Sequence, residues 1–395
     1  MTAARDLWTL PIDWSRGFEE EIVWRTNVIT SRNGREQRIA LRAKPRVAYT
    51  FTSFLARGGL EAAILRVAEQ QGRTLYLPYP RDHGQIGVPS GEGALAINLL
   101  SAPAWLAGAS FAAVINVETG AIEMVEIASV SGLTATLREP LRHPALTRSK
   151  VMQVREGRLA DDIDIRAGTN RVGTVEVVFD ADPVATPFPD YGDAPEIFNG
   201  VELFELQPNW AGGVQHGFQQ DRLDIDLTKG AVDAAFPVAF TTRSVQLRFL
   251  LRNDDQISRL LGLFSRSRGR QKSFYTPLWL SEFRPISDIA DFTSNVTFEG
   301  RDLFDAYAES TVHRTIAIRA IGNGFIRRGV TSLSLDNDDN TVFHLASPLP
   351  AIDRADLAWA GWLGRARFSS DRLTINWLTD SVAEATVTMT VLEQA

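Results

Sequence analysis

Paired carboxylates are the first residues in the chain whose types and spacing could do chemistry. The segments Asp161–Asp164 and Asp224–Asp226 each place acids two positions apart, and glycoside hydrolysis needs two carboxyl groups that face each other across the scissile bond. However, residues i and i+2 of a strand point the same way, and both segments alternate with Ile or Leu, as half-exposed strands do. We therefore interpret these acids as strand surface and expect no hydrolytic site.

A second acidic run, Asp336–Asn340, begins like a calcium-binding loop, in which oxygen ligands at alternate positions converge on a hard cation. Thr341 stands where the sharp turn of such a loop needs Gly, and Ser347 stands where its bidentate Glu belongs. The run is therefore predicted to be a solvated turn rich in Asx residues.

The histidines and glycines form no recognisable catalytic or cofactor motif. None of the five histidines has the helical spacing of a metal site; they are His83, His143, His216, His313 and His344. The Walker-type loop, the complete dinucleotide fingerprint and the Gly-x-Ser-x-Gly elbow are all missing from the sequence. We predict that the protein is not an enzyme and that it binds no cofactor and no metal.

The composition excludes further classes of protein. The chain has 395 residues, 44% of them hydrophobic, and no cysteine, so it can bury substantial cores but cannot form disulfides or thiolate metal sites. Its 48 acidic residues outnumber 41 Lys and Arg, and the resulting net charge of −7 argues against general nucleic-acid binding.

One uncharged run, residues 93–117, is about long enough to cross a bilayer. Pro103, several polar residues and a bulk made of Ala and Gly favour buried strands and a loop instead. The segment Met1–Asp13 carries charges and lacks the apolar core of a secretory signal. We expect no stable membrane span and no cleaved export signal.

Two stretches of the chain resemble each other. Residues 7–14 (Leu-Trp-Thr-Leu-Pro-Ile-Asp-Trp) align without a gap with residues 203–210 (Leu-Phe-Glu-Leu-Gln-Pro-Asn-Trp), at an offset of 196. A predicted strand with alternating apolar residues follows in each half. On these strands we match Val47, Tyr49, Phe51 and Leu55 with Val245, Leu247, Phe249 and Leu251. A helix is predicted next in each half, around Ala63–Ala68 and Ile257–Phe264, with Asn253 as the N-cap of the second.

These landmarks predict a tandem duplication in a mainly β fold with a few helices, a β-rich α+β class. The segment Ala181–Pro195 holds four prolines, so it cannot be sheet interior and reads as a linker. We place the first unit at 1–180, the Pro-rich linker at 181–200 and the second unit at 201–395. Each unit is predicted to hold a strand and helix module, with a hairpin in the first (1–80 and 201–283), and then a β-barrel or sandwich module (81–180 and 284–395).

The segment Glu21–Arg46 carries the strongest local signal. Asn33-Gly34 between two β-prone runs predicts a hairpin, since both central residues of a type I′ turn need positive φ. Its cations form a strip of Arg35, Arg38, Arg42, Lys44 and Arg46. Two interpretations are open: cross-strand ion pairs with Glu21 and Glu36 that are each worth little, or a docking strip for an acidic neighbour, since Arg suits interface ion pairs.

This hairpin, with the pattern T-N-V-I-T-S-x-x-G-x-E-Q-R-x-A-L-R-x-x-P-R, resembles a stretch near the N-terminus of tail-tip and baseplate structural proteins of long-tailed bacteriophages, of the distal tail or minor tail type. The resemblance is good over Trp24–Arg46 and looser over the rest of the first half. Asn27 departs from the family pattern, which often has Asp, and the second half lacks the Glu-Gln-Arg part. The resemblance implies a virion component at the distal end of the tail, assembled in the host cytoplasm, and it implies no reaction.

The same resemblance implies a set of partners and an assembly. The partners would be the tail tube protein, the tape measure protein and the baseplate hub or receptor-binding protein. Three copies of a two-unit chain would present six similar units and could adapt a six-fold tube to a three-fold hub. We therefore expect a homo-oligomer, a trimer with pseudo-six-fold symmetry, with a hexamer as the alternative.

Two tryptophans leave a second function open. Trp359 and Trp362 fall in a segment that is six residues longer in the second half than in the first. An exposed aromatic loop could bind a host-surface glycan or receptor, whereas Trp is usually buried. A host-surface binding module of the tail is thus the alternative function, and a cell-wall hydrolase is the third.

Overall fold

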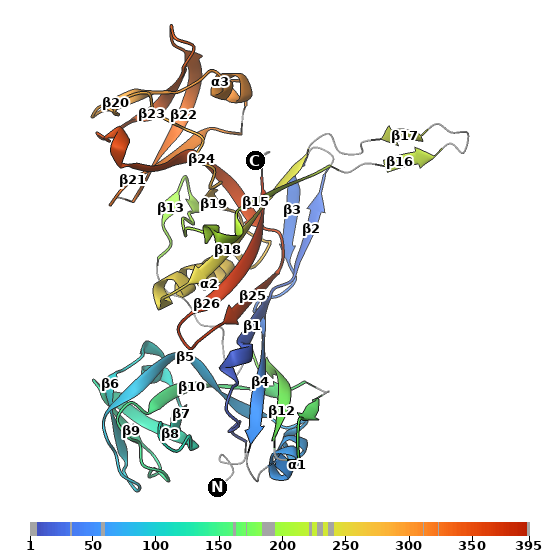
Figure 1. Cartoon of the computed structure of the whole chain (residues 1–395), viewed down its shortest axis with the longest axis vertical. Helices are drawn as coiled ribbons and strands as arrows, with labels where there is room; N and C mark the ends of the chain where they lie inside the picture. Colours follow the sequence, from blue (N-terminus) through green and yellow to red (C-terminus); the bar gives the residue numbers. More distant parts are fainter. Residues whose placement is uncertain are drawn as a thin grey trace.

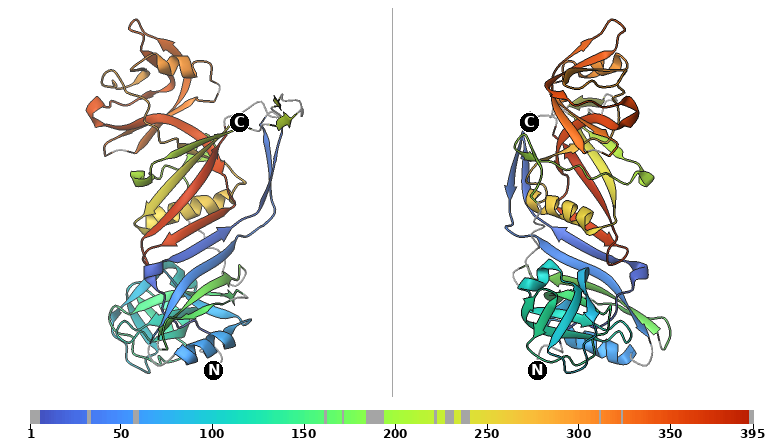
Figure 2. Two further views of the ribbon diagram at one scale, coloured as in Figure 1. Left: turned by 45° about the vertical axis from the view of Figure 1, so that its right-hand side comes forward. Right: turned by 90° about the vertical axis from the view of Figure 1, so that its left-hand side faces the viewer.

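The computed structural model describes residues 6–31, 34–56, 60–160, 163–170, 172–183, 194–220, 223–226, 232–235, 241–310, 312–322 and 324–392. The chain is mainly β with a few helices, as predicted. It forms an elongated molecule with a small barrel at each end and β-sheet between them (Figure 1; Figure 2).

The first half of the chain contains a sheet and one helix, which we call the first sheet unit. Its strands are β1 (Phe18–Val23), β4 (Arg46–Ala56), β5 (Leu75–Val88), β10 (Lys150–Leu159), β11 (Ile165–Ala167) and β12 (Val172–Ala181). Strand β4 is central and pairs antiparallel with β1 on one side and β12 on the other. Helix α1 (Leu60–Gln70) follows β4 and buries Val67 in the core of this unit.

The first barrel is inserted between β5 and β10. Its other elements are β6 (Ala96–Ser101), η3 (Ala104–Gly108), β7 (Phe111–Ile115), β8 (Ile122–Ser131) and β9 (Thr134–Leu137). The pairing runs β5–β6–β9–β8–β7–β10 and closes between β10 and β5. The interior has its own apolar core, which includes Ile97, Val114 and Ala135. The uncharged run 93–117 thus supplies buried strands, as predicted, and no described helix is long and apolar enough to span a membrane.

The second half has a second sheet unit and a second barrel. The sheet unit consists of β15 (Gln215–Gln219), β18 (Thr242–Leu251), α2 (Asp254–Ser267), β19 (Phe274–Pro277), β24 (Leu357–Phe368), β25 (Arg372–Trp377) and β26 (Ala383–Val391). The barrel adds β20 (Thr293–Phe298), α3 (Asp302–Tyr307), β21 (Thr315–Ala320), β22 (Phe325–Leu335) and β23 (Thr341–Leu349). Its pairing runs β20–β23–β22–β21–β24, and the segment 283–286 closes it by bonding to β24 and β20. Asn253 caps α2 by accepting a hydrogen bond from the amide of Gln256, as predicted.

The two halves share local geometry as well as strand order. The amide of Asp13 donates to the carbonyl oxygen of Thr52 at 2.7 Å, and the amide of Asn209 donates to that of Arg248 at 2.7 Å. Both pairs keep the offset of 196. Asp13 and Asn209 each precede a short 3-10 turn, η2 (Trp14–Arg16) and η4 (Trp210–Gly212). Duplication of one unit is our inference from this correspondence.

The predicted match between the central strands β4 and β18 is wrong by two positions at Phe51. Phe51 of β4 lies opposite Val177 of β12, and Leu247 of β18 lies opposite Val387 of β26. Phe51 therefore corresponds to Leu247 and not, as matched from the sequence, to Phe249. A shift of two residues leaves the same side chains on the apolar face, so alternation alone could not reveal it.

The sheet units and barrels are nested in the sequence. Strands β10 to β12 fall in the predicted β module 81–180, yet they return to the first sheet unit and pair with β5 and β4. Strands β25 and β26 return to the second sheet unit in the same way. Residues 184–193 of the predicted linker lie outside the described residues, and the short hairpin β13 (Ile197–Phe198) and β14 (Val201–Glu202) follows them.

Strand β1 joins the two sheet units. One of its edges pairs with β4, and the other pairs antiparallel with β25 over its whole length, Phe18–Val23 against Arg372–Trp377. The strands β11–β12–β4–β1–β25–β26–β18–β15 therefore form one continuous run.

Polar contacts fix this join in one register. Glu20 of β1 is 2% exposed, and its carboxylate accepts hydrogen bonds from Tyr79 Oη (2.8 Å) in the first sheet unit and Trp377 Nε1 (3.1 Å) in the second. Arg81 donates to Asp254 Oδ1, at the start of α2, through Nε (3.0 Å) and Nη2 (2.8 Å). A buried carboxylate is costly without such donors, so another register of β1 against β25 would be disfavoured.

A glycine tests how tightly β10 and β12 pack. A Cβ at Gly157 would overlap the carbonyl oxygen of Asp180 and lie 2.6 Å from the ring of Phe179. We expect Gly157→Ala to lower the free energy of unfolding by about 3 kcal/mol, measured by urea denaturation. Gly91→Ala is the control, since nothing lies within 4 Å of its Cβ position; equal losses in both variants would contradict the packing described.

Candidate interaction surfaces

Each sheet unit carries a hairpin arm between its first two strands. The first arm is β2 (Thr26–Thr30) and β3 (Glu36–Ala40), and the second arm is β16 (Leu223–Asp226) and β17 (Val232–Ala235). The first arm confirms the predicted hairpin, although Asn33 of its turn lies outside the described residues. The first arm reaches along the second sheet unit, whereas the second arm projects away from the body (Figure 1).

Asp371, in the turn between β24 and β25, anchors the base of the first arm. Its carboxylate accepts hydrogen bonds from the amides of Thr26 (2.6 Å) and Arg270 (2.9 Å), and its carbonyl oxygen accepts one from the amide of Trp24 (2.8 Å). Arg270 Nη2 also donates to the carbonyl oxygen of Thr26 at 2.8 Å. Because these partners come from the arm and from the segment after α2, one side chain ties the two halves together.

Arg367 of β24 holds β3, the second strand of the first arm. Its Nε and Nη2 donate to the two carboxylate oxygens of Glu36 at 2.8 and 2.7 Å, and both side chains are about nine-tenths buried. Burial alone would raise the pKa of Glu36, but the hydrogen bonds and the positive charge of Arg367 outweigh it and hold that pKa below its ordinary value. A bidentate pair shielded from water is stronger than a surface ion pair.

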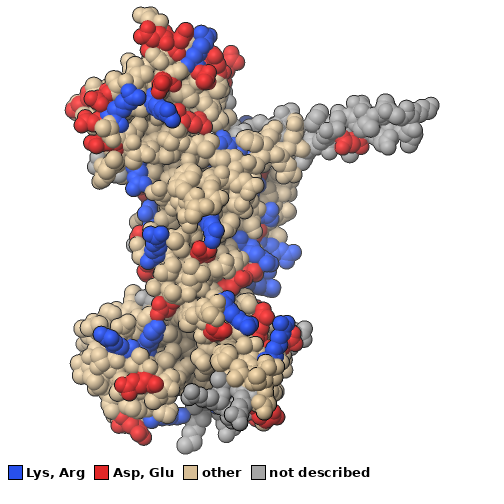
Figure 3. Space-filling view, in the orientation of Figure 1, with Lys and Arg blue, Asp and Glu red and all other residues tan. Residues whose placement is uncertain are grey.

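The predicted cationic strip divides in two. Arg38 lies beside Glu36 (3.7 Å), and burial lowers its pKa, whereas Arg42 Nη1 donates to the carbonyl oxygen of Val23 (3.3 Å). The exposed members are Arg35, Lys44 and Arg46. Figure 3 shows Lys and Arg gathered near the level where the arm leaves the body. Docking of an acidic neighbour on these exposed cations stays a prediction.

The two glutamates of the hairpin segment pair mainly with the second sheet unit. Glu21 lies 2.9 Å from Arg372, as Glu36 lies against Arg367. Inside the hairpin, Glu36 also lies 3.7 Å from Arg38. The acids of the segment therefore serve the join between the halves.

Trp359 and Trp362 lie in β24 and not on a loop. They are 8% and 3% exposed, so burial, the usual state of Trp, is confirmed and the exposed aromatic loop is wrong. Trp362 packs edge-on against Phe283 at 5.1 Å inside the second barrel, and Trp359 lies 6.0 Å from Trp279. Neither ring is presented for a glycan or receptor.

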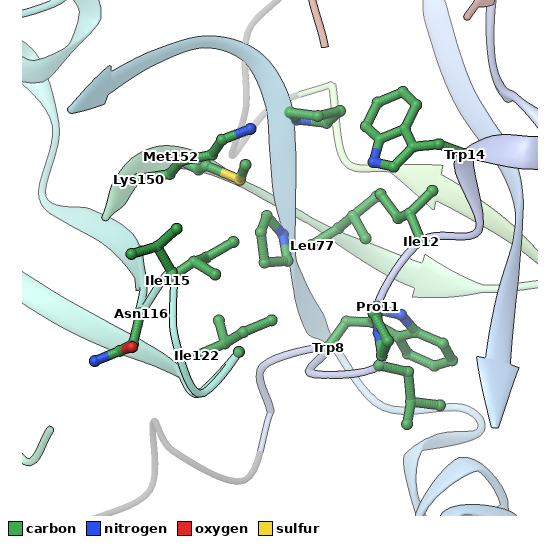
Figure 4. A pocket seen from close by; sticks show the side chains of 15 residues that line it. Trp8, Pro11, Ile12, Trp14, Leu77, Ile115, Asn116, Ile122, Lys150 and Met152 are labelled. Atoms are coloured by element: carbon green, nitrogen blue, oxygen red, sulfur yellow. The ribbon is translucent and has the colours of Figure 1, made fainter. Parts of the chain in front are cut away.

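An apolar pocket opens between the N-terminal segment and the first barrel (Figure 4). Its lining includes Trp8, Pro11, Ile12, Trp14, Leu77, Ile115, Ile122, Lys150 and Met152. By strand pairing, Trp359 corresponds to Lys150 and Phe325 to Ile122, and in the second half these two rings pack together at 5.6 Å. Aromatic side chains thus fill in the second half a space that the first half leaves open.

The acidic run 336–340 forms a turn, as predicted. Asp336 accepts hydrogen bonds from the amides of Asp338 (2.9 Å) and Asn340 (2.8 Å), and the bond from Asn340 is the main cause that lowers its pKa. Within the described ranges, no group of three or more His, Asp or Glu could hold a metal ion. Asp161 and Asp162 lie outside those ranges.

The residues that join the halves were not found from the sequence. Glu20, Asp371 and Arg367 carry no motif, and Glu36 and Arg367 are 331 positions apart. The offset of 196 between the halves places β1 and β15 at corresponding positions, and this is the one signal in the sequence that could have drawn attention to β1.

Comparison with known proteins adds no family. No protein-family model matches this chain, and no curated protein matches it. The join between the halves and the arm that crosses it are therefore the features from which a function can be inferred.

Loss of the Glu36 charge should loosen the first arm. Breaking a buried ion pair costs on the order of 3 kcal/mol, so Glu36→Gln should speed amide hydrogen exchange in β2 and β3 at pH 7. Glu139→Gln removes an exposed partner of Arg142 and should leave these amides unchanged. The wild-type arm should also loosen in acid, because the pKa of Glu36 is lower in the folded chain than in the unfolded chain. Its carboxylate therefore stabilises the folded arm fully above the unfolded pKa, and this stabilisation is lost as the pH falls through the folded pKa. Unchanged exchange in Glu36→Gln would contradict the anchoring role.

His313 should make the second barrel sensitive to mild acid. Burial first, and then the charge of Arg243, lower its pKa from 6.5 to about 4, and its ring packs 4.8 Å from that of Tyr307. The unfolded chain then binds a proton that the folded chain excludes, so stability is full above pH 6.5 and falls toward pH 4. His313→Gln should show a smaller drop in Tm between pH 7 and 4.5 in calorimetry. Identical pH profiles would contradict burial of the neutral ring.

Proposed function

We propose that the protein is a structural component of a bacteriophage tail tip or baseplate. Copies of the chain would form a ring or collar that links the tail tube and tape measure to the hub or receptor-binding proteins. Three chains would present six sheet units and six barrels around the axis, in keeping with the expected trimer.

The observation that carries this proposal is the docking of one sheet unit on the next. The segment with the phage-like pattern, Trp24–Arg46, builds the first arm, and this arm is held by Asp371 and Arg367 of the second sheet unit. An arm that clamps a neighbouring unit suits a protein whose permanence comes from interfaces, since the sequence offers no cysteine for a covalent staple.

The arrangement of the barrels supports the same proposal. The joined sheets form the body of the molecule, and the barrels lie at its two ends, away from the join (Figure 2). With this arrangement, the continuous sheet could serve as the scaffold of a ring. The barrels, which lie outside the sheet, could then contact different neighbours.

Labelling of virions tests the proposal. Gold-labelled antibody raised against the purified chain should bind particles of the phage that encodes it at the distal end of the tail, seen by negative-stain microscopy. An antibody against the major capsid protein of that phage is the control and should label heads only. Absence of the chain from purified virions, shown by mass spectrometry, would contradict a structural role in the tail.

A further inference from the structure

The continuous run of strands through both sheet units ends in two edges that have no strand partner in the part of the chain that the structure describes. They are the outer edges of β15 and β11, at the opposite ends of the run β11–β12–β4–β1–β25–β26–β18–β15. An open edge presents unpaired amides and carbonyls, and proteins usually protect it with charges, Pro or a bulge. The β15 sequence, Gln-His-Gly-Phe-Gln, contains no Lys, Arg, Asp, Glu or Pro. This edge is therefore unprotected.

The strand that corresponds to β15 in the first half is the strand that makes the join. Ile22 of β1 lies opposite Val47 of β4, and Phe218 of β15 lies opposite Arg243 of β18, so both pairs keep the offset of 196. Ile22 is 0% exposed and lies opposite Leu373 of β25, whereas Phe218 is 68% exposed, with Arg243 5.8 Å from its ring. A large apolar side chain thus stands open at a position that is fully covered in the first half.

The strand that corresponds to β25 is the other open edge. Ile165 of β11 lies opposite Val175 of β12, and Ile375 of β25 lies opposite Ala385 of β26. Val175 and Ala385 occupy the same place on β12 and β26, because their partners on β4 and β18 are also 196 positions apart. By the same count, Ile163 corresponds to Leu373 and Ala167 to Trp377.

A groove lies at the ends of β10 and β12, at the place that corresponds to the site where the first arm is held on the second sheet unit. Its lining includes Thr74, Arg158, Leu159 and Asp180. Arg158 of β10 corresponds to Arg367 of β24, since their partners on β12 and β26 also correspond. Arg158 is exposed, whereas Arg367 is buried against Glu36. The second arm keeps the strand register of the first, with Asp226 opposite Val232 where the first arm has Thr30 opposite Glu36, although its strands are one residue shorter. An arm of this register and a groove that contains Arg158 therefore both occur on each chain.

We propose that β15 of one chain pairs antiparallel with β11 of a second copy of the chain, repeating between chains the join that β1 and β25 make within one. The register follows from Phe18 opposite Trp377 and Ile22 opposite Leu373. It places Phe218 of one chain opposite Ile163 of the next, and His216 opposite Ile165. The second arm then reaches over the groove beside Arg158.

This pairing is head-to-tail, because a chain offers β15 at one end of its sheet and β11 at the other. Repetition of such a contact gives a ring when the rotation closes and a filament when it does not. The inference deepens the proposed function by naming the surface through which the ring would form. It concerns self-association only, so it can fail while the chain is found in virions, and it can hold for a ring that is not part of a tail.

Disulfide trapping tests the register, because the chain has no native cysteine. Phe218→Cys and Ile163→Cys chains carrying different tags should form a mixed disulfide dimer on mild oxidation. Phe218→Cys mixed with Ala167→Cys should not, since four residues separate the two targets along the sequence. The proposal would be overturned if Phe218→Cys formed a dimer with Ala167→Cys but not with Ile163→Cys, or if it formed no dimer with either. It would also be overturned if Phe218→Cys formed a disulfide only with a different virion protein.

Sedimentation velocity tests the role of the edge in assembly. Phe218→Asp should convert the oligomer to single chains, because it places a charge on the edge that must be covered. Phe292→Asp is the matched control, since Phe292 is also an exposed aromatic residue, at 80%, but lies between β19 and β20, away from β15 and β11 in the sequence. Unchanged assembly of Phe218→Asp, equal loss in both variants, or a wild-type chain that stays monomeric at high concentration would each overturn the proposal.

Discussion

The shared strand β1 is the constraint on which the rest of the structure depends. Because it pairs with β4 on one edge and β25 on the other, two sheets that could have been separate domains become one. Glu20 adds specificity, since its buried carboxylate finds donors in Tyr79 and Trp377, one from each half. The first arm follows β1 directly in the chain and is held by the second sheet unit, so its path also begins at this join.

The sequence predicts elements better than it predicts their partners. The structure has elements where short stretches of sequence predicted them. These stretches are the matching residues 7–14 and 203–210, the helix cap at Asn253 and the hairpin before Arg46. The match of Phe51 with Phe249 failed because a slip of two residues preserves the apolar face. Arg367 and Asp371 could not be predicted as arm anchors, since their partners are more than three hundred residues away and follow no motif.

The differences between the halves are as informative as their likeness. In the second barrel, Trp359 and Phe325 fill a space that stays open near Ile122 and Lys150 in the first. In the sheets, Ile22 is buried, whereas Phe218 is exposed to solvent. The barrels thus differ in packing, and in the described residues the edge of β1 has a neighbouring strand whereas the edge of β15 has none. A neighbour supplied by a second chain removes that difference and gives every unit the same surroundings.

The most direct test of this account is a cryo-EM reconstruction of the assembled chain at a resolution that separates the barrels. The account predicts a closed ring in which the step from the first to the second sheet unit of one chain equals the step to the first sheet unit of the next chain, with β15 against β11. Unequal steps, or a ring in which β15 faces solvent, would contradict it.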